Sequence, residues 1–242
     1  MSPILFNAAK AAERAMHAQH ARANNLSNVE TVGFKSLMEF TTPQRLQGSG
    51  FDTSVTTRTN LSLNNFSQGN MMPTGRALDV AIEGDGFIAV EGRGGTELYT
   101  RSGEMEVNQA GEVTIRGRRV LTDGGPLVLP DYQDVSISND GLVSIIPPGG
   151  DGILEAGLLK IVNPGNEKVT LDESGLFRSI DGEQFESTDA ASIKSGYLEG
   201  SNVSGFGELV GIMNLTRQFE VQVKVMSKAD ELARMGNELM RV

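Results

Sequence analysis

Glycine and proline gather in the middle of this 242-residue chain, and their distribution limits the fold more than any other feature of the sequence. Residues 36–205 contain 25 of the 29 glycines and seven of the eight prolines. Because both residue types destabilise the interior of a helix, long helices are expected only at the two ends. Charge is divided in the same way: residues 1–35 carry +2 and residues 206–242 carry zero, so the middle carries −12 within a total of −10. The sequence therefore predicts two helical ends around a separate, acidic middle.

Both ends show the apolar spacing of an amphipathic helix. Residues 4–26 carry apolar side chains, mostly alanines, at alternating steps of four and three. A second stripe with this spacing begins near Glu208 and continues to Met240, which predicts a helix of roughly nine turns. Burial against the chain's own core is the ordinary explanation of such stripes, and contact with other chains is the alternative.

The middle of the chain has the pattern of β structure. Apolar residues alternate over residues 78–82, a glycine-rich turn follows, and residues 87–90 are apolar again, which predicts a hairpin. A weak repeat places one glycine in each of three similar turns, at Gly111, Gly141 and Gly175. Such turns need a positive φ angle, which glycine adopts most readily.

These patterns predict an α+β fold in which N- and C-terminal α-helices form a coiled-coil-like arm next to a glycine-rich all-β middle domain. Residues 1–35 are expected to form the first helix and the loop after it, and residues 205–242 the second helix. Between them we expect an extended connector at 36–76, rich in Thr, Ser, Asn and Gln, and the β-rich domain at 77–204.

Composition argues against most kinds of catalytic or binding site. Without cysteine the chain has no disulfide, no thiolate nucleophile and no thiolate metal site. A charge of −10 disfavours binding to nucleic acid or to anionic membranes, and no apolar run is long enough to insert across a membrane. We therefore predict no catalytic residue, no cofactor and no metal.

Three weaker patterns have simple structural explanations. The spacing G-x-G-x-x-A at residues 84–89 matches a dinucleotide fingerprint, but β-type residues follow where a helix is required. His17 and His20 could share a helix face but lack further ligands. The carboxylates that could act as a glycosidase pair all lie beside turn residues, and they are Asp123, Asp131, Asp134 and Asp140. A secreted β-rich carbohydrate-active enzyme is therefore the less favoured alternative.

Four signature segments occur in order along nearly the whole chain. They are ANNLSNVETVGFK at 23–35, ALDVAIEGDGF at 77–87, YTRSG at 99–103, and LEGSNV at 198–203 with the later residues Arg217, Phe219, Glu220 and Lys224. Jointly they resemble the signatures of flagellar basal-body rod and hook proteins. The form R-x-F-E-x-Q-x-K at 217–224 is most similar to proximal rod proteins, because distal rod and hook proteins usually carry Tyr where Phe219 stands. Gly211 departs from the helix former that relatives tend to have there.

The resemblance implies a structural subunit of the flagellar rod, located in the periplasm. Such a subunit assembles helically with itself and with other rod proteins and transmits torque, and a distal-rod or hook-type subunit is the alternative. The resemblance also implies export of the unfolded chain through the flagellar type III apparatus. This replaces the cytoplasmic location that the lack of a secretory signal at the N-terminus would otherwise predict.

On this interpretation the apolar stripes and part of the signature segments form an assembly interface between subunits. The residues that we assign to it are Leu5, Ala8, Ala12, Ala15, Leu26, Asn28, Gly33, Phe34, Leu209, Ile212, Phe219, Val223, Met226 and Met240.

Overall fold

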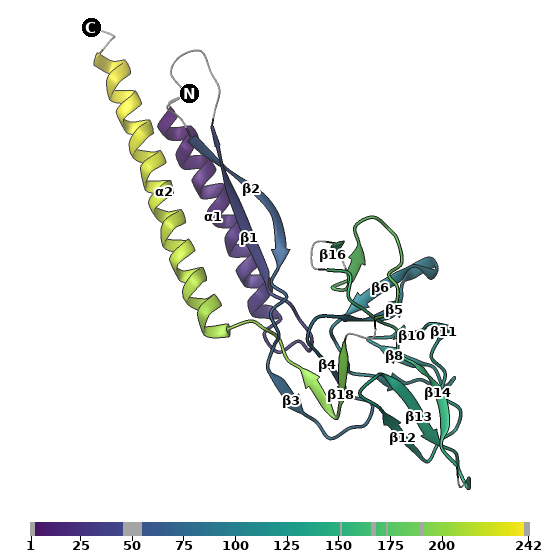
Figure 1. The fold of residues 1–242 in the computed structure, drawn as a ribbon. Helices are drawn as coiled ribbons and strands as arrows, with labels where there is room; N and C mark the ends of the chain where they lie inside the picture. Colours follow the sequence, from purple (N-terminus) through teal and green to yellow (C-terminus); the bar gives the residue numbers. More distant parts are fainter. Residues whose placement is uncertain are drawn as a thin grey trace. The chain divides into compact units, whose positions relative to one another are not determined.

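The structure is a computed structural model, and it describes residues 3–45, 55–150, 152–165, 168–172, 174–188 and 191–239. The chain divides into two compact units (Figure 1). Unit 1 consists of Met1–Val29, Leu37–Asn65 and Val203–Val242, and unit 2 consists of Glu30–Ser36 and Phe66–Asn202. A helix near each end and a β-rich middle are present, so the predicted α+β fold is confirmed at that level.

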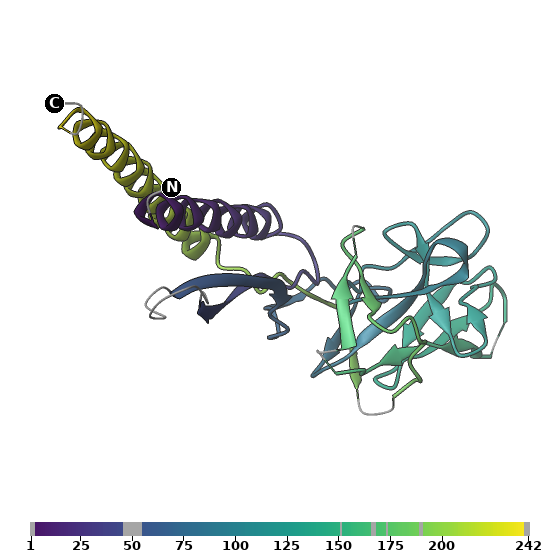
Figure 2. The ribbon, with the colours of Figure 1, turned by 90° about the horizontal axis from the view of Figure 1, so that it is seen from above.

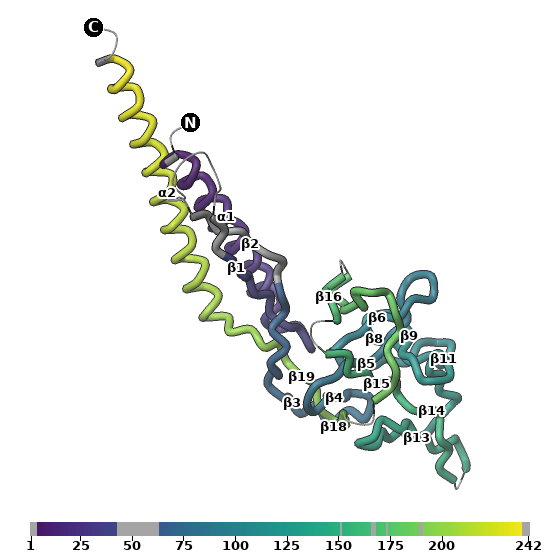
Figure 3. The backbone as a smooth tube through the Cα atoms, turned by 45° about the horizontal axis from the view of Figure 1, so that its top comes forward, coloured from purple at the N-terminus to yellow at the C-terminus, as the bar shows by residue number. Residues whose placement is uncertain are grey.

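Unit 1 is built on two long helices, α1 (Pro3–Ser27) and α2 (Gly205–Leu239). They run in opposite directions and lie side by side, as Figures 1 and 2 show. The longer helix, α2, continues past the beginning of α1 (Figure 3). Ser204 caps α2, because its hydroxyl accepts a hydrogen bond from the backbone N–H of Gly207 at 3.3 Å.

A hairpin of β1 (Leu37–Arg45) and β2 (Val55–Asn64) packs against α1 in the same unit. The strands are antiparallel, with Thr41 opposite Thr59. The structure differs here from the extended connector predicted for residues 36–76. Threonine-rich strands lack the alternation of apolar and polar residues that marks a strand in sequence, although their β-branched side chains favour extended backbone.

Unit 2 contains one five-stranded antiparallel sheet and several smaller sheets. The five strands lie in the order β15 (Ile161–Val162), β5 (Phe87–Glu91), β6 (Glu97–Thr100), β17 (Phe177–Ser179) and β16 (Val169–Leu171). One three-stranded sheet contains β7 (Glu106–Val107), β8 (Val113–Ile115) and β9 (Arg118–Arg119). The other contains β12 (Asp134–Ile137), β13 (Leu142–Ile146) and β14 (Leu154–Leu158).

Three pairs of strands and one short 3-10 helix complete the described part of unit 2. The pairs are β3 (Met71–Pro73) with β19 (Tyr197–Glu199), β4 (Val80–Glu83) with β18 (Ser192–Ser195), and β10 (Leu121–Thr122) with β11 (Gly125–Pro126). The 3-10 helix η1 (Arg93–Gly95) joins β5 to β6.

The two strands predicted to form a hairpin around residues 83–86 are present, but they do not pair with each other. β4 pairs with β18, whereas β5 pairs with β6 and β15. The hairpin prediction is therefore wrong. β5 is buried on both faces, with Ile88 and Val90 in a large aliphatic cluster and Phe87 and Ala89 in a smaller aromatic one. A strand in that position needs hydrogen-bond partners on both edges, and β6 and β15 supply them.

The predicted repeat of glycine turns is confirmed. Gly111, Gly141 and Gly175 have φ angles of +78°, +87° and +76°. In each turn the glycine N–H donates to the carbonyl of the residue three positions earlier. The N–H of that earlier residue donates to the carbonyl of the residue that follows the glycine. The three turns join β7 to β8, β12 to β13 and β16 to β17, so the repeat in the sequence is a repeat of one hairpin turn.

Candidate assembly interface

The face of α1 that packs in unit 1 is lined by alanine. Ala8, Ala12 and Ala15 are buried, with 4%, 6% and 5% of their surfaces exposed, and Leu5 is half-buried. Small side chains shorten the distance at which two helices can pack, and α2 is the helix in contact with α1. The small-residue stripe predicted from the sequence is therefore buried within the chain.

A row of half-buried residues on α2 matches this alanine face. Its members recur at alternating steps of four and three, and they are Glu208, Ile212, Leu215, Phe219, Gln222, Met226 and Ala229. This is a seven-residue repeat of the kind that pairs helices along a shared seam. Leu209 and Val223 lie one residue beyond members of the row and are 50% and 42% exposed. Met240 lies outside the described residues.

A polar cluster closes the seam where α1 ends and α2 begins. Arg22 pairs with Glu208 at 2.9 Å, and the Asn25 side-chain amide donates to the other carboxylate oxygen of Glu208 at 3.1 Å. Asn25, which is 2% exposed, also donates to the Leu37 carbonyl at 3.0 Å and accepts from the Leu37 N–H at 2.7 Å. One buried side chain thus joins α1, α2 and the start of β1.

Gly211 has a steric role beside this cluster. A Cβ atom at this position would lie 2.5 Å from Nη1 and 2.6 Å from Cζ of Arg22. Glycine inside a helix costs about 1 kcal/mol relative to alanine. The departure from the family pattern therefore leaves room for the guanidinium group that pairs with Glu208.

α2 also carries large apolar side chains that remain exposed. Phe206 is 80% exposed, Leu232 69%, Met213 58% and Val221 53%. Val221 and Leu232 belong to an apolar groove of about 590 Å³ that also includes Ile4 of α1 and Val225. Contiguous apolar surface of this kind commonly marks a site of contact with another macromolecule.

In unit 2 a buried ion pair joins the signature segments at 23–35 and 198–203. Lys35 Nζ lies 2.7 Å from Glu199 Oε1, and neither side chain has exposed surface. The same carboxylate oxygen accepts the Gly69 N–H at 2.8 Å, and Lys35 donates to the Ser67 carbonyl at 2.8 Å. The Glu199 carbonyl accepts the Gly33 N–H at 2.7 Å. These contacts join three parts of unit 2 that are distant in sequence: residues 33–35, residues 67–69 and Glu199.

Arg101, in the third signature segment, brings a second cation to the same carboxylate. Its Nε lies 3.8 Å from Glu199 Oε2, its Nη2 donates to the Gly84 carbonyl at 2.6 Å, and its guanidinium lies 5.7 Å from the centre of the Phe87 ring. Burial lowers the pKa of Lys35 and the pKa of Arg101, and the Glu199 carboxylate opposes both decreases. The Glu199 carboxylate therefore helps to keep both buried side chains, Lys35 and Arg101, in their charged forms.

Gly33 fits closely beside Arg101. Its φ angle is +69°, and a Cβ atom would lie 2.3 Å from the backbone nitrogen of Ser102. Only glycine permits both this angle and this approach. Gly33 is buried and Phe34 is half-buried in unit 2, whereas Leu26 and Asn28 are half-buried in unit 1. The residues assigned to one assembly interface are thus distributed over two units.

Comparisons with known proteins match these regions. A family model described as "Flagellar basal body rod FlgEFG protein C-terminal" matches residues 194–239, which contain Glu199 and all of α2. A second, described as "Flagellar hook protein FlgE/F/G D1 domain", matches residues 81–145, which contain Arg101. The flagellar basal-body rod protein FlgF of Escherichia coli (strain K12) is 30% identical over 248 residues, covering 99% of this chain and 99% of its own. The chain belongs to the flagellar basal-body rod protein family.

Relatives in the rod family carry two names. FlgF of Salmonella typhimurium is 31% identical over 99% of both chains. The basal-body rod protein FlgG of Agrobacterium fabrum is 30% identical over 87% of this chain and 89% of its own. As a member of the rod family, the chain is a structural subunit of the basal-body rod, the part of the flagellum that crosses the periplasm. The family, the general function and the location predicted from the sequence are confirmed.

The rod family is a structural family rather than an enzyme family. Among the described residues, no three His, Asp or Glu side chains are arranged to hold a metal ion. Asp134 accepts from the Val135 N–H at 2.9 Å, Asp123 accepts from the Ser187 hydroxyl, and Asp131 and Asp140 are exposed. In the described part of the chain, neither helix combines the length and apolar character needed to cross a membrane.

The predicted interface omits four residues that organise the two units. Lys35, Glu199 and Arg101 form the buried charge cluster of unit 2, and Asn25 links three elements of unit 1. All four lie inside the signature segments. In the sequence, each of these polar side chains lies next to residues that a core would bury, which indicates that it is itself buried. The sequence does not show which residue it pairs with.

Proposed function

We propose that this rod-family chain is a proximal-rod subunit that assembles with copies of itself and with other rod proteins through the helices of unit 1. The rod formed in this way transmits torque. The observation that carries the proposal is the exposed apolar surface of α2, where Phe206 and Leu232 are 80% and 69% exposed. Removing such side chains from water provides roughly 25 cal/mol for each Å² buried, which favours association with a neighbour.

The seven-residue row on α2 supports a coiled-coil-like arm. Ile212, Phe219 and Met226 occupy equivalent positions seven residues apart. In the proposed arm they pack on the alanine face of α1, and the exposed Leu209 and Val223 at the edge of the row contact neighbouring subunits. Different patches that meet on identical copies generate an open helical assembly rather than a closed ring.

We also propose export of this chain through the flagellar type III apparatus. A chain without cysteine cannot form a disulfide that locks a fold before passage or links chains afterwards. The export apparatus would then be a transient partner of the unfolded chain, whereas rod proteins would be the permanent partners.

The phenylalanine at position 219 supports the proximal subtype, whereas coverage does not separate the two, because a FlgF relative covers as little as 89% of this chain and a FlgG relative as much as 96%. The FlgF proteins of Escherichia coli and Salmonella typhimurium align with 99% of this chain, and the FlgG protein of Agrobacterium fabrum aligns with 87%. A distal, FlgG-type subunit is the second candidate, supported by the 30% identity of that FlgG protein.

Deletion of the gene tests the proposal directly. We expect a non-motile strain whose basal bodies stop before the hook, and full restoration by the wild-type gene on a plasmid. Electron microscopy of purified basal bodies labelled with an antibody to this chain then locates it. Label at the base of the rod supports the proximal assignment, and label along the hook-side part supports the distal one. Complete, motile flagella in the deletion strain would contradict the rod function.

A further inference from the structure

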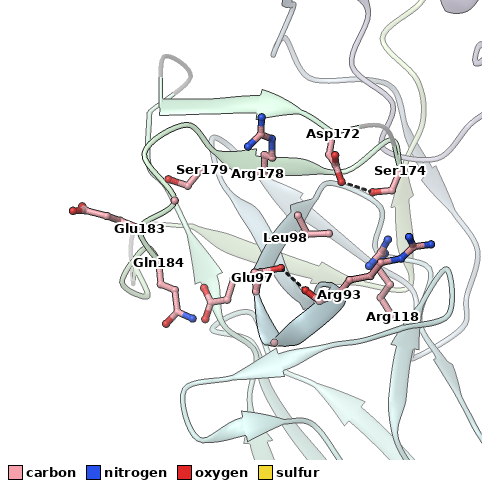
Figure 4. A pocket seen from close by; sticks show the side chains of 13 residues that line it. Arg93, Glu97, Leu98, Arg118, Asp172, Ser174, Arg178, Ser179, Glu183 and Gln184 are labelled. Carbon is pink, nitrogen blue, oxygen red and sulfur yellow. Dashed lines mark hydrogen bonds between the residues drawn. The ribbon is translucent and has the colours of Figure 1, made fainter.

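Unit 2 contains a pocket of about 680 Å³ with an unusual concentration of arginine. It is bounded by η1, β6, β9, Asp172, Ser174 and residues between 178 and 184. Arg93, Arg118 and Arg178 line it, and Figure 4 shows the guanidinium groups of Arg93 and Arg118 at the same end of the pocket. Glu183 and Gln184 lie at the opposite end.

These three arginines differ from the other arginines of unit 2, each of which donates a side-chain hydrogen bond within the chain; those are Arg76, Arg101, Arg116 and Arg119. None of the three guanidinium groups of the pocket has a hydrogen bond or ion pair with the part of the chain that the structure describes. The basic side chains of unit 2 that pair with carboxylates include Lys35, Arg76, Arg101, Arg119 and Lys160. Residues 66–202 hold 22 acidic and ten basic side chains, so three unpaired arginines in one pocket are not explained by a shortage of carboxylates.

Among the described residues, two of the three carboxylates that line the pocket have hydrogen-bond partners. Glu97 pairs with Lys160 at 2.8 Å and accepts the Tyr99 hydroxyl at 3.1 Å, so both of its oxygens are occupied. Asp172 accepts the Ser174 hydroxyl at 3.1 Å. Because Lys160 neutralises Glu97, the described lining sets three arginines against two carboxylates without a cationic partner, Asp172 and Glu183, and keeps a net positive charge.

We propose that this pocket receives carboxylate side chains from unit 2 of a second copy of this chain within the rod. The planar guanidinium group binds a carboxylate through two parallel hydrogen bonds, which favours arginine over lysine at such a contact. Copies of a subunit with a charge of −10 repel one another, and a local basic pocket offsets that repulsion where two copies meet. The exposed acidic side chains that a second copy offers include Glu83, Glu104, Glu106, Asp131 and Asp140.

The chemistry of the pocket favours this occupant over a glycan of the cell wall. Sugar rings commonly stack on aromatic side chains, and the residues found to line the pocket include no aromatic ring. The proposal rests on the proposed function, because it requires that copies of the chain lie next to one another in an assembly.

A photo-crosslinking amino acid at Gln184, which is exposed on the pocket wall, identifies the occupant in intact basal bodies. We expect an adduct with twice the mass of the chain, and mass spectrometry should map the second site to an acidic segment of unit 2. An adduct with another rod protein, an adduct with cell-wall material, or no adduct in basal bodies that contain the chain would each overturn the proposal. Basal bodies without the chain would instead refute the proposed function.

Charge reversal supplies a second measurement with a matched control. In the crosslinking strain, Arg93→Glu and Arg118→Glu should each lower the yield of adduct about tenfold, because each places a carboxylate where a carboxylate is to bind. Lys168→Glu makes the same change in net charge at an exposed position that does not line the pocket, and it should leave the yield unchanged. Because neither guanidinium group has a hydrogen bond or ion pair with the described residues, the melting temperature of the purified variants should match that of the wild type. Equal yields in all three variants would refute the proposal.

Discussion

Replacement of Lys35 by methionine tests the buried ion pair of unit 2 most directly. Methionine keeps an unbranched side chain of similar length but removes the charge. Glu199 then remains buried with the Gly69 N–H and with Arg101 Nε at 3.8 Å, and it loses the ammonium group at 2.7 Å. The variant therefore isolates the contribution of one charge to a site with no exposed surface.

The magnitude follows from the geometry of the pair. Two unit charges 2.7 Å apart attract by roughly 6 kcal/mol at an effective dielectric constant of about 20, and much of this attraction offsets the cost of removing both charges from water. Removing one partner of a buried pair costs about 3–5 kcal/mol. Because Arg101 still compensates Glu199, we expect the lower value, about 3 kcal/mol, which corresponds to a decrease in melting temperature of about 10 °C.

Circular dichroism of the purified full-length chain, followed in the β-sheet region during heating, measures this decrease. Lys168→Met removes an exposed lysine of the same unit and should shift the transition by less than about 2 °C. Glu199→Gln should be more damaging than Lys35→Met, because it leaves Lys35 and Arg101 buried without a counter-charge. In the double variant the losses should be smaller than the sum, as expected for residues that interact directly. A Lys35→Met variant that melts within 2 °C of the wild type would refute the reasoning.

Three further predictions concern the seam, the aromatic cluster and the glycine in α2. Phe219→Asp places a charge in the half-buried row of α2 and should prevent incorporation into basal bodies, whereas Glu231→Gln at an exposed position should not. Motility and the content of the chain in purified basal bodies measure the effect. Normal motility of the Phe219→Asp strain would contradict the prediction. Burial raises the pKa of Tyr99 from 10.0 to about 12, so the folded state keeps a proton that the unfolded chain has lost. The stability of unit 2 should accordingly fall by roughly 2 kcal/mol between pH 10 and pH 12, in urea unfolding of the wild type but not of Tyr99→Phe. Gly211→Ala should stabilise α2 by up to about 1 kcal/mol in an Arg22→Ala background. In the wild type the gain should be clearly smaller, because the added methyl group displaces Arg22 from Glu208. Equal effects in both backgrounds would show that the glycine is not needed for the ion pair between Arg22 and Glu208.

Features of the fold that depend on neighbouring residues could be predicted from the sequence. The two helices follow from apolar spacing, and the turns at Gly111, Gly141 and Gly175 follow from a positive φ angle that other residues resist. Each of these features involves residues within a few positions of one another. Paired strands, in contrast, can be far apart in the sequence. Residues 78–90 predict two strands correctly, but nothing in that segment indicates that β4 pairs with β18, more than 100 residues later.

The buried charge cluster was unpredictable for the same reason. Lys35 and Glu199 are 164 positions apart, and each is an ordinary surface residue when considered by itself. In the sequence, only the resemblance to a family marks their segments, and it predicts that Gly33 and Phe34 lie in contacts between subunits. The structure gives Gly33 a role within unit 2, because the backbone of Ser102 occupies the space next to it.

The buried residues of the signature segments and the exposed apolar surface of α2 therefore indicate two separate functions, folding of unit 2 and contact with neighbouring subunits. Gly33, Lys35, Arg101 and Glu199 are buried and interact with one another inside unit 2, so substitutions there should act on the folding of the isolated chain. Phe206 and Leu232 of α2 are mostly exposed in the chain alone, so substitutions there have little to disturb until a neighbour covers them. A loss of motility accompanied by a lower melting temperature thus points to the first group, and a loss of motility at an unchanged melting temperature points to the second. Variants of the two groups that showed the same combination of effects would mean that folding and assembly are not separated in this chain.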